Sequence, residues 1–216
     1  METEIYRVRF SDAELSQARQ FWGPICSYLQ RYIPAHGTTL DLGAGYCHFI
    51  NTIASQHKIA VDVNEEALEK YAANDVRIVA GSGVDLSAIP PDSVDTAFAS
   101  NVYEHFPSRS DVLRSFYEVR RVLKSGGRFI VMQPNFPYCW RTYFDFFDHV
   151  LIFTRGGMEE GLVAAGFRIN VARDRFLPFT SKGRLPKAPW LVSAYLGLPL
   201  LWRLFGAQML LVASKP

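Results

Sequence analysis

The stretch TTLDLGAGYCHFI, residues 38–50, decides the fold of this 216-residue chain. It begins with an apolar and Thr-containing run that predicts a short buried strand, turns at Gly43, Ala44 and Gly45, and continues as a helix. A strand, a glycine turn and a helix make up one half of a nucleotide-binding unit. Glycine suits such a turn because a Cβ atom would keep the backbone away from a ligand. The helix that follows presents its free N–H groups to that ligand.

Two residues near this turn distinguish between candidate ligands. A dinucleotide fingerprint has a third glycine where this chain has His48. Asp41 ends the strand, and its carboxylate would repel a pyrophosphate and attract a cation. S-adenosylmethionine carries an ammonium and a sulfonium group, so the loop favours it over NAD. The structural alternative is a tight strand-to-helix turn with a capping acid.

A second acid supports the same cofactor. The run KIAVDV, residues 58–63, predicts the next strand, and Asp62 stands at its end. An acid about 20 residues after the loop is placed to accept hydrogen bonds from ribose hydroxyls. Asp62 could instead be a plain acid before the next helix. That role is less favoured because Asn64 is the better cap, and Glu65 and Glu66 already fill the first turn.

Length, charge and cysteine content narrow the class of protein. The 216 residues fit one domain, and a net charge of +2 without a Lys/Arg block gives no indication of a nucleic-acid partner. The three cysteines have no paired spacing, which predicts a reducing compartment and no metal site. The N-terminus has no apolar signal region, and no run reaches the roughly 18 apolar residues of a spanning helix. We therefore expect a cytoplasmic protein.

Strand and helix patterns alternate along the rest of the chain. Further strands are predicted at residues 76–80, 94–100, 128–133, 167–171 and 208–213, with helices at 64–73, 108–124 and 154–165. Such alternation implies a parallel sheet with right-handed crossovers, in which a ligand lies at the carboxyl ends of the central strands. Four groups fall at such ends, namely Asp41, Asp62, the loop Ser82–Asp85 and Asn101.

The N-terminal segment, residues 1–36, is expected to form a helical cover over the cofactor cleft. The run SDAE at residues 11–14 is typical of a helix start. Pro24 predicts a boundary between one helix that ends near Trp22 and a second that ends near Tyr32.

Two later segments have an unusual composition. Residues 138–153, YCWRTYFDFFDHVLIF, are too aromatic for a solvated loop, so we expect a lid that covers the cleft and lines the acceptor pocket. Residues 174–206 form a basic and apolar insertion, with no acid after Asp174. This tail would close the cleft as a hairpin or form a homodimer face. The alternatives are that it binds an amphipathic acceptor or rests on an anionic membrane surface.

Together these pieces resemble the class I S-adenosylmethionine-dependent methyltransferases over about residues 38–171 and the last strand. DLGAG is similar to the family's cofactor loop, SNVYEHF to its segment after the fourth strand, and LKSGG to the turn before the fifth. The resemblance implies an α/β, Rossmann-like, seven-stranded and mostly parallel sheet with helices on both faces. Its last strand would be antiparallel and inserted beside the fifth, within a single domain whose cofactor-binding core is residues 38–171.

The resemblance also implies which residues contact S-adenosylmethionine. They are Asp41, Gly43, Ala44, Gly45, Asp62, Val63, Ser82, Gly83, Val84 and Asn101. The chain departs from the family pattern at two positions. Cys47 occupies the place of the third loop glycine, and Ser82 replaces the usual acid of the adenine-side loop, for which Asp85 is a substitute.

Methyl transfer from a sulfonium is an in-line displacement, in which the protein aligns the reactants and excludes water. An oxygen acceptor also needs a nearby base, and His105 and His149 are the candidates. The alternative for His105 is a hydrogen bond to a backbone group beside the cofactor, and for His149 a structural role in the lid. The residues that would orient His149 are Asp148, Asp145 or Glu104.

We therefore expect a methyltransferase for a small-molecule acceptor. O-methylation of a sugar, a glycan intermediate or a lipid-linked compound is the leading hypothesis. C-methylation of a quinone-like ring is the alternative among enzymes. A non-catalytic S-adenosylmethionine-binding partner subunit is the alternative from another class, and an NAD-binding protein is disfavoured by Asp41 and His48.

Overall fold

The computed structural model describes residues 12–179 and 188–216, with side chains from residue 18 onward. Residues 1–11 lie outside the described residues, and with them the predicted helix start at Ser11. Residues 180–187 of the predicted tail also lie outside them.

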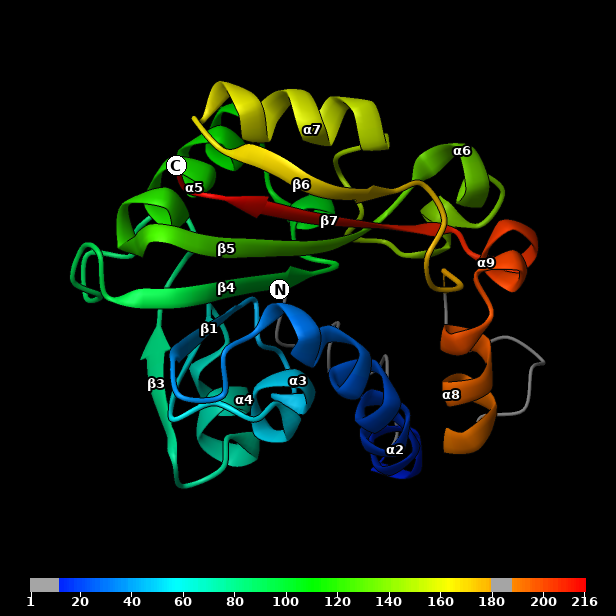
Figure 1. The fold of residues 1–216 in the computed structure, drawn as a ribbon, viewed down its shortest axis with the longest axis horizontal. Helices are drawn as coiled ribbons and strands as arrows, with labels where there is room; N and C mark the ends of the chain where they lie inside the picture. The colour runs from blue at the N-terminus through cyan, green and yellow to red at the C-terminus, as the bar shows by residue number, and fades with distance from the viewer. Residues whose placement is uncertain (1–11, 180–187) are drawn as a thin grey trace.

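A seven-stranded sheet forms the centre of the molecule, in the order β3-β2-β1-β4-β5-β7-β6 (Figure 1). Strands β1 to β5 pair in parallel, whereas β7 lies between β5 and β6 and is antiparallel to both. The predicted Rossmann-like sheet with its reversed last strand beside the fifth is confirmed. The strands are β1 (Thr38–Leu42), β2 (His57–Asp62), β3 (Val76–Ala80), β4 (Val94–Ser100), β5 (Leu123–Pro134), β6 (Arg168–Arg173) and β7 (Gln208–Ser214).

Helices cover both faces of this sheet (Figure 1). One apolar cluster joins the sheet to α5 (Arg109–Val122) and α7 (Arg155–Ala164). A second cluster joins its other face to α2 (Asp12–Leu29), α3 (His48–Thr52), α4 (Glu65–Tyr71), α8 (Pro189–Gly197) and α9 (Pro199–Phe205). Because both faces of the sheet are covered, β1 and β4 are buried along almost their whole length rather than at alternate positions.

The predicted N-terminal caps are present. The side chain of Asn64 accepts a hydrogen bond from the backbone N–H of Ala67, as expected for the residue that begins α4. The hydroxyl of Ser108 accepts one from the N–H of Asp111 at the start of α5. Thr154 caps α7 in the same way. Local side-chain chemistry therefore determines where these helices begin.

The predicted helix boundary at Pro24 is wrong. A single helix, α2, runs through this proline, and a short 3-10 turn, η1 (Gln30–Tyr32), follows it. Ile25, Cys26 and Leu29 are buried against the sheet on this helix. The free energy gained by burying these side chains offsets the loss of the backbone hydrogen bond that the proline cannot make.

In the part of the tail between β6 and β7 that the structure describes, the chain forms two short helices, α8 and α9. The ring of Trp202 on α9 lies 5.1 Å from that of Phe176 and 5.8 Å from that of Tyr28 on α2, measured between centroids. The Tyr195 hydroxyl donates to the carbonyl of Phe176 at 2.6 Å, and the Trp202 indole N–H donates to the carbonyl of Tyr195. These contacts hold the tail against α2. Within the described ranges, no helix has the length and apolar content needed to cross a bilayer.

Candidate functional site: the carboxyl edge of the sheet

The predicted cofactor residues all lie where parallel strands end. Gly43, Ala44 and Gly45 follow β1, Asp62 is the last residue of β2, and Asn101 follows β4 directly. The loop 82–84 follows β3. In a parallel sheet these ends share one edge, which is where ligands of open α/β sheets bind.

The glycine loop is tied to the neighbouring strand. The backbone N–H groups of Gly43 and Ala44 both donate to the carbonyl of Val61, at 2.8 and 3.0 Å. Gly43 has φ +70°, and a Cβ added there would lie 2.4 Å from a methyl carbon of Val102. At Gly45, with φ +49°, an added Cβ would meet no atom within 4 Å among the described residues. The loop thus has a packed side at Gly43 and an open side at Gly45.

Cys47 adopts the backbone conformation that the third loop glycine would otherwise provide. Its φ is +57°, in the left-handed region that glycine usually occupies, and it immediately precedes α3. The side chain is fully buried, and the Cys47 N–H donates to the carbonyl of Ala44 at 2.7 Å. Burial of a small apolar side chain offsets the cost of this conformation.

The three cysteine thiols should be inert in the folded protein. All are buried, and burial raises the pKa of the Cys26, Cys47 and Cys139 thiols to about 12. Because the thiolate is the reactive form, an aromatic disulfide reagent at pH 8 should label none of them within minutes. The same protein unfolded in guanidinium should react with the reagent at all three cysteines. Rapid labelling of native Cys47 would show that the loop opens.

Asp62 connects β2 to the glycine loop. One of its carboxylate oxygens accepts from the N–H of Gly45 at 2.8 Å, and the other accepts from the N–H of Asn64 at 2.9 Å. The adjacent side chain of Val63 is 58% exposed. This acid therefore holds the open side of the loop in place at the edge of the sheet.

Asp41 lies beneath the loop, with 3% of its surface exposed. Burial, together with the neighbouring charge of Asp62, raises the pKa of the Asp41 carboxyl well above its usual value, and a hydrogen bond from the Ile50 backbone opposes this effect. A cation bound nearby would favour its ionised form. Two close acids and an open glycine backbone are features that fit the cationic cofactor predicted from the sequence.

The remaining predicted cofactor residues are more accessible. Ser82 is exposed, and its hydroxyl accepts a 3.4 Å hydrogen bond from the N–H of Val84. Asp85, the predicted substitute for the adenine-side acid, is exposed and accepts from the N–H of Ser87. Asn101 is exposed with φ +52°. These positions leave polar atoms at the edge available to a ligand.

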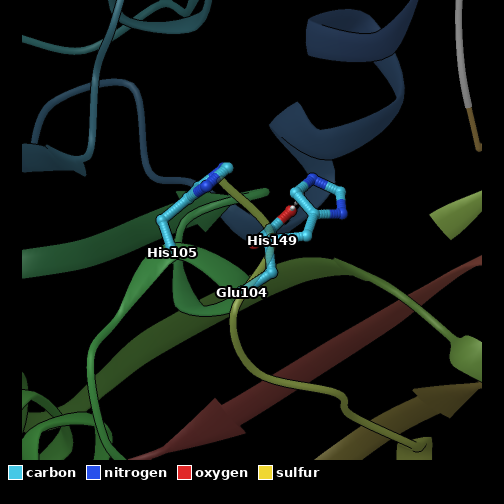
Figure 2. Close-up of side chains that lie close together, drawn as sticks. All are labelled: Glu104, His105 and His149. Atoms are coloured by element: carbon cyan, nitrogen blue, oxygen red, sulfur yellow. Dashed lines mark ion pairs between the residues drawn. The ribbon is translucent and has the colours of Figure 1, made fainter. Parts of the chain in front are cut away.

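The two predicted bases come together with a glutamate at the same edge. Glu104 and His105 belong to the 3-10 turn η2 (Tyr103–His105), whereas His149 comes from the aromatic segment 138–153. Figure 2 shows the three side chains pointing toward one another. The two imidazole ring centroids are 5.1 Å apart.

His105 is oriented by the aromatic segment. Its Nδ1 lies 3.0 Å from the backbone carbonyl oxygen of Asp148 and 3.3 Å from a carboxylate oxygen of the same residue. Because a carbonyl oxygen only accepts, Nδ1 carries the proton of the neutral ring and Nε2 is the basic nitrogen. About a fifth of the side chain is exposed. The acid next to His149 in sequence thus pairs with His105.

His149 is packed among aromatic rings. Its ring stacks on that of Phe146 at 4.9 Å and is tilted against that of Tyr143 at 4.7 Å. Its Nε2 lies 4.0 Å from one carboxylate oxygen, Oε1, of Glu104. Of the three acids expected to orient His149, the structure therefore places Glu104 beside it.

Glu104 is completely buried, and burial raises the pKa of its carboxyl above the ordinary value. Oε2 accepts a 2.5 Å hydrogen bond from the side-chain amide of Gln133, at the end of β5. Among the described residues, Oε1 has no hydrogen-bond partner. The backbone carbonyl of Glu104 accepts from the N–H groups of Val150 and Leu151, which fixes the aromatic segment to η2. Gln133 was not anticipated, because its strand position alone gives no sign of this contact.

The aromatic segment has an inner and an outer set of side chains. It begins within the short helix α6 (Phe136–Cys139) and contains the 3-10 turn η3 (Tyr143–Asp145). Tyr143 is fully buried, and its hydroxyl donates to the carbonyl of Leu151. The outer set is exposed by 42 to 84% and comprises Tyr138, Trp140, Phe144 and Phe147.

Comparisons with known proteins agree with this geometry. Residues 40–131 match a family model described as a methyltransferase domain. No curated protein gives a significant match to the sequence. Solved structures with the same fold include a methyltransferase from Thermotoga maritima described as a possible histamine N-methyltransferase, with a TM-score of 0.66 and 18% identity over 94% of this chain and 92% of that one.

Two further structures share the fold. An S-adenosylmethionine-dependent methyltransferase from Archaeoglobus fulgidus has a TM-score of 0.63 and 20% identity, over 88% of this chain and 93% of that one. A geranyl diphosphate methyltransferase in complex with the cofactor has a TM-score of 0.64 and 15% identity, over 89% and 84%. Sheet order, reversed β7 and glycine loop together define the methyltransferase form of the Rossmann-like fold. The chain contains a class I S-adenosylmethionine-dependent methyltransferase domain.

Proposed function

We propose that this methyltransferase transfers a methyl group to an oxygen atom of a small-molecule acceptor, and that His105 and His149 take up the acceptor proton. The acceptor class is a sugar, a glycan intermediate or a lipid-linked compound. The observation that carries the proposal is the His105–Asp148 pair, which leaves Nε2 of His105 as a basic nitrogen beside the cofactor edge. His149 lies next to it, in a drier aromatic setting.

The bound S-adenosylmethionine supplies the activated methyl group. Asp62 would accept hydrogen bonds from its ribose, the loop from Gly43 to Gly45 would face its methionyl part, and Val63 and residues 82–84 would line its adenine side. Asn101 would contact the methionyl end. The open space beside Gly45 supports this arrangement, because the cofactor needs close access to that backbone.

The aromatic segment would form the wall of the acceptor pocket. Tyr143 and Phe146 already contact His149, and the neighbouring rings of Phe144 and Phe147 remain exposed. An acceptor that packs against them would exclude water from the reacting atoms. Geranyl diphosphate, the compound in the name of one structural neighbour, is likewise a small molecule.

The apolar tail would help to bring a lipid-linked acceptor to this edge. Leu200 and Leu204 on α9 are 75% and 68% exposed, and Arg203 lies between them in sequence. Exposed apolar side chains next to a basic one suit a peripheral contact with anionic lipid. A homodimer contact through the same side chains is the alternative arrangement.

Two other functions compete with O-methylation. C-methylation of a quinone-like ring would use the same cofactor edge and an aromatic-walled pocket. A non-catalytic partner subunit would bind the cofactor without turnover. The paired His105 and Asp148 favour catalysis at oxygen, because a base held next to the cofactor suits removal of a hydroxyl proton during the transfer, whereas a ring carbon loses its proton only after the new bond has formed.

Replacing His105 with alanine should lower the rate of methyl transfer by roughly 100-fold, the usual contribution of a general base. The assay would follow ¹³C-methyl transfer from S-adenosylmethionine to a panel of sugars, lipid-linked sugars and quinols. NMR of the product would identify the methylated atom. Cofactor affinity should stay unchanged, because the residue is assigned to the acceptor.

The matched control is the exposed His57, whose replacement by alanine should leave the rate unchanged. Equal turnover by the wild type and a His105→Ala, His149→Ala double variant would remove both assigned bases. A methyl group found on carbon would favour the quinone-type reaction. Tight cofactor binding with no turnover on any acceptor would favour the partner-subunit alternative.

A further inference from the structure

The contact between Glu104 and His149 has an unusual length. Nε2 and Oε1 are 4.0 Å apart, whereas a hydrogen bond between such groups would measure about 2.7–2.9 Å. Both side chains are at least nine-tenths buried, and Oε1 of Glu104 finds no other hydrogen-bond partner among the described residues. Burying a carboxylate oxygen without a donor is costly in free energy, so Oε1 of Glu104 requires a hydrogen-bond donor or a cation at this point.

The spacing matches two ligands of one metal ion. Zn²⁺ binds histidine nitrogen and carboxylate oxygen at about 2.0–2.2 Å, so two of its ligand atoms lie about 3.4 Å apart in a tetrahedral site and about 4 Å apart when the angle opens. One potential ligand atom from each of Glu104, His105 and His149 lies within 4.8 Å of the others. Small side-chain rotations would bring all three to bonding distance.

Neighbouring groups already orient two of these side chains as in metal sites. Metal-bound histidines commonly hydrogen-bond a carbonyl or carboxylate through the second ring nitrogen, and metal-bound carboxylates accept further hydrogen bonds. His105 contacts Asp148 through Nδ1, which leaves Nε2 as the nitrogen available to an ion. Glu104 accepts from Gln133 through Oε2, which leaves Oε1 for the ion.

We propose that Glu104, His105 and His149 bind a divalent transition-metal ion of the Zn²⁺ or Mn²⁺ type. Two imidazoles and one carboxylate suit such ions better than Mg²⁺ or Ca²⁺, which prefer oxygen ligands. Three protein ligands leave open coordination positions for an acceptor oxygen. The inference rests on the proposed function for its role and changes one step of it. With the ion bound, the two imidazoles are its ligands, so the ion rather than a free imidazole would activate the acceptor hydroxyl, whose proton would pass to water. Ion binding itself does not depend on methyl transfer.

The competing structural interpretation is a direct ion pair between Glu104 and a protonated His149. It predicts a charge-assisted hydrogen bond, which the 4.0 Å separation does not provide. It also assigns no part to His105, although the ring of His105 lies 5.1 Å from that of His149. The ion accounts for all three side chains at once.

The test is a calorimetric titration of the chelator-stripped protein, without S-adenosylmethionine, with Zn²⁺ and separately with Mn²⁺. We expect one ion per chain, with Zn²⁺ bound more tightly than Mn²⁺. Affinity should fall at least tenfold in each of three variants. Glu104→Gln keeps the shape of the buried side chain, His149→Phe keeps the ring that stacks on Phe146, and His105→Ala changes a partly exposed position.

His57→Ala is the control, and it should bind the ion as the wild type does. Absence of one-to-one binding in the wild type, or unchanged affinity in the three variants, would overturn the proposal. His105→Ala decides the matter if the buried variants do not fold. Failure of the two proposals is distinguishable: an ion bound without any methyl transfer rejects the O-methylation proposal alone, and methyl transfer by a protein that binds no ion rejects the metal site alone.

Discussion

Asp62→Ala is expected to weaken the binding of S-adenosylmethionine by about 100-fold or more. The carboxylate would accept two hydrogen bonds from the ribose, and each hydrogen bond to a charged group contributes about 1.5–3 kcal/mol. Losing about 3 kcal/mol corresponds to roughly a 100-fold rise in Kd. The substitution also leaves the N–H groups of Gly45 and Asn64 without their acceptor, which loosens the loop that faces the cofactor.

Calorimetry with S-adenosylmethionine, S-adenosylhomocysteine and NAD would measure this effect. The first two ligands should bind the wild type and NAD should not. Asp75→Ala is the matched control, since this acid is largely exposed and forms a surface ion pair with Lys58. A thermal melt of each variant would separate lost binding from lost folding. Unchanged affinity in a folded Asp62→Ala protein would mean that the ribose is held elsewhere.

Gly43→Ala should have the largest effect on stability of any single methyl addition in the loop. The added Cβ would lie 2.4 Å from a methyl carbon of Val102, and the residue would retain φ +70°. Overpacking costs about 1–3 kcal/mol and the left-handed conformation about 1–2 kcal/mol. A total near 3 kcal/mol should lower the Tm by roughly 6–12 °C for a domain of this size.

A second substitution tests the cause of this loss. Val102→Ala removes the methyl groups that the new Cβ would meet, so the double variant should recover the overpacking part but not the conformational part. Gly156→Ala is the control, because its Cβ would meet no described atom within 4 Å and its φ is not positive. Its Tm should stay the same or rise slightly. Equal losses in the single and double variants would show that Val102 is not the obstacle.

Much of the fold could be predicted from local patterns. Strands at residues 76–80 and 94–100 have the predicted boundaries, and Asn64 and Ser108 cap helices as expected. These signals are local, because apolar periodicity and capping depend on residues within one or two turns. The boundary expected at Pro24 failed for the opposite reason. Packing of α2 on the sheet outweighs the local preference of one proline.

Some features of the candidate site could likewise be predicted from the sequence, and others depend on tertiary packing. The sequence by itself placed Asp62, the glycine loop and Asn101 at strand ends, because strand direction in an alternating α/β chain already brings those ends to one edge. It also singled out His105 and His149 as titratable groups near that edge.

Only the tertiary structure decided which groups meet. Asp148 pairs with His105, while its sequence neighbour His149 lies beside Glu104. This exchange follows from two backbone hydrogen bonds to the Glu104 carbonyl, which dock the aromatic segment on η2. Contacts between segments far apart in the chain depend on packing and leave no periodic signal. The cofactor edge could therefore be predicted from the sequence, whereas the cluster of Glu104, His105 and His149 forms only when the aromatic segment docks on η2.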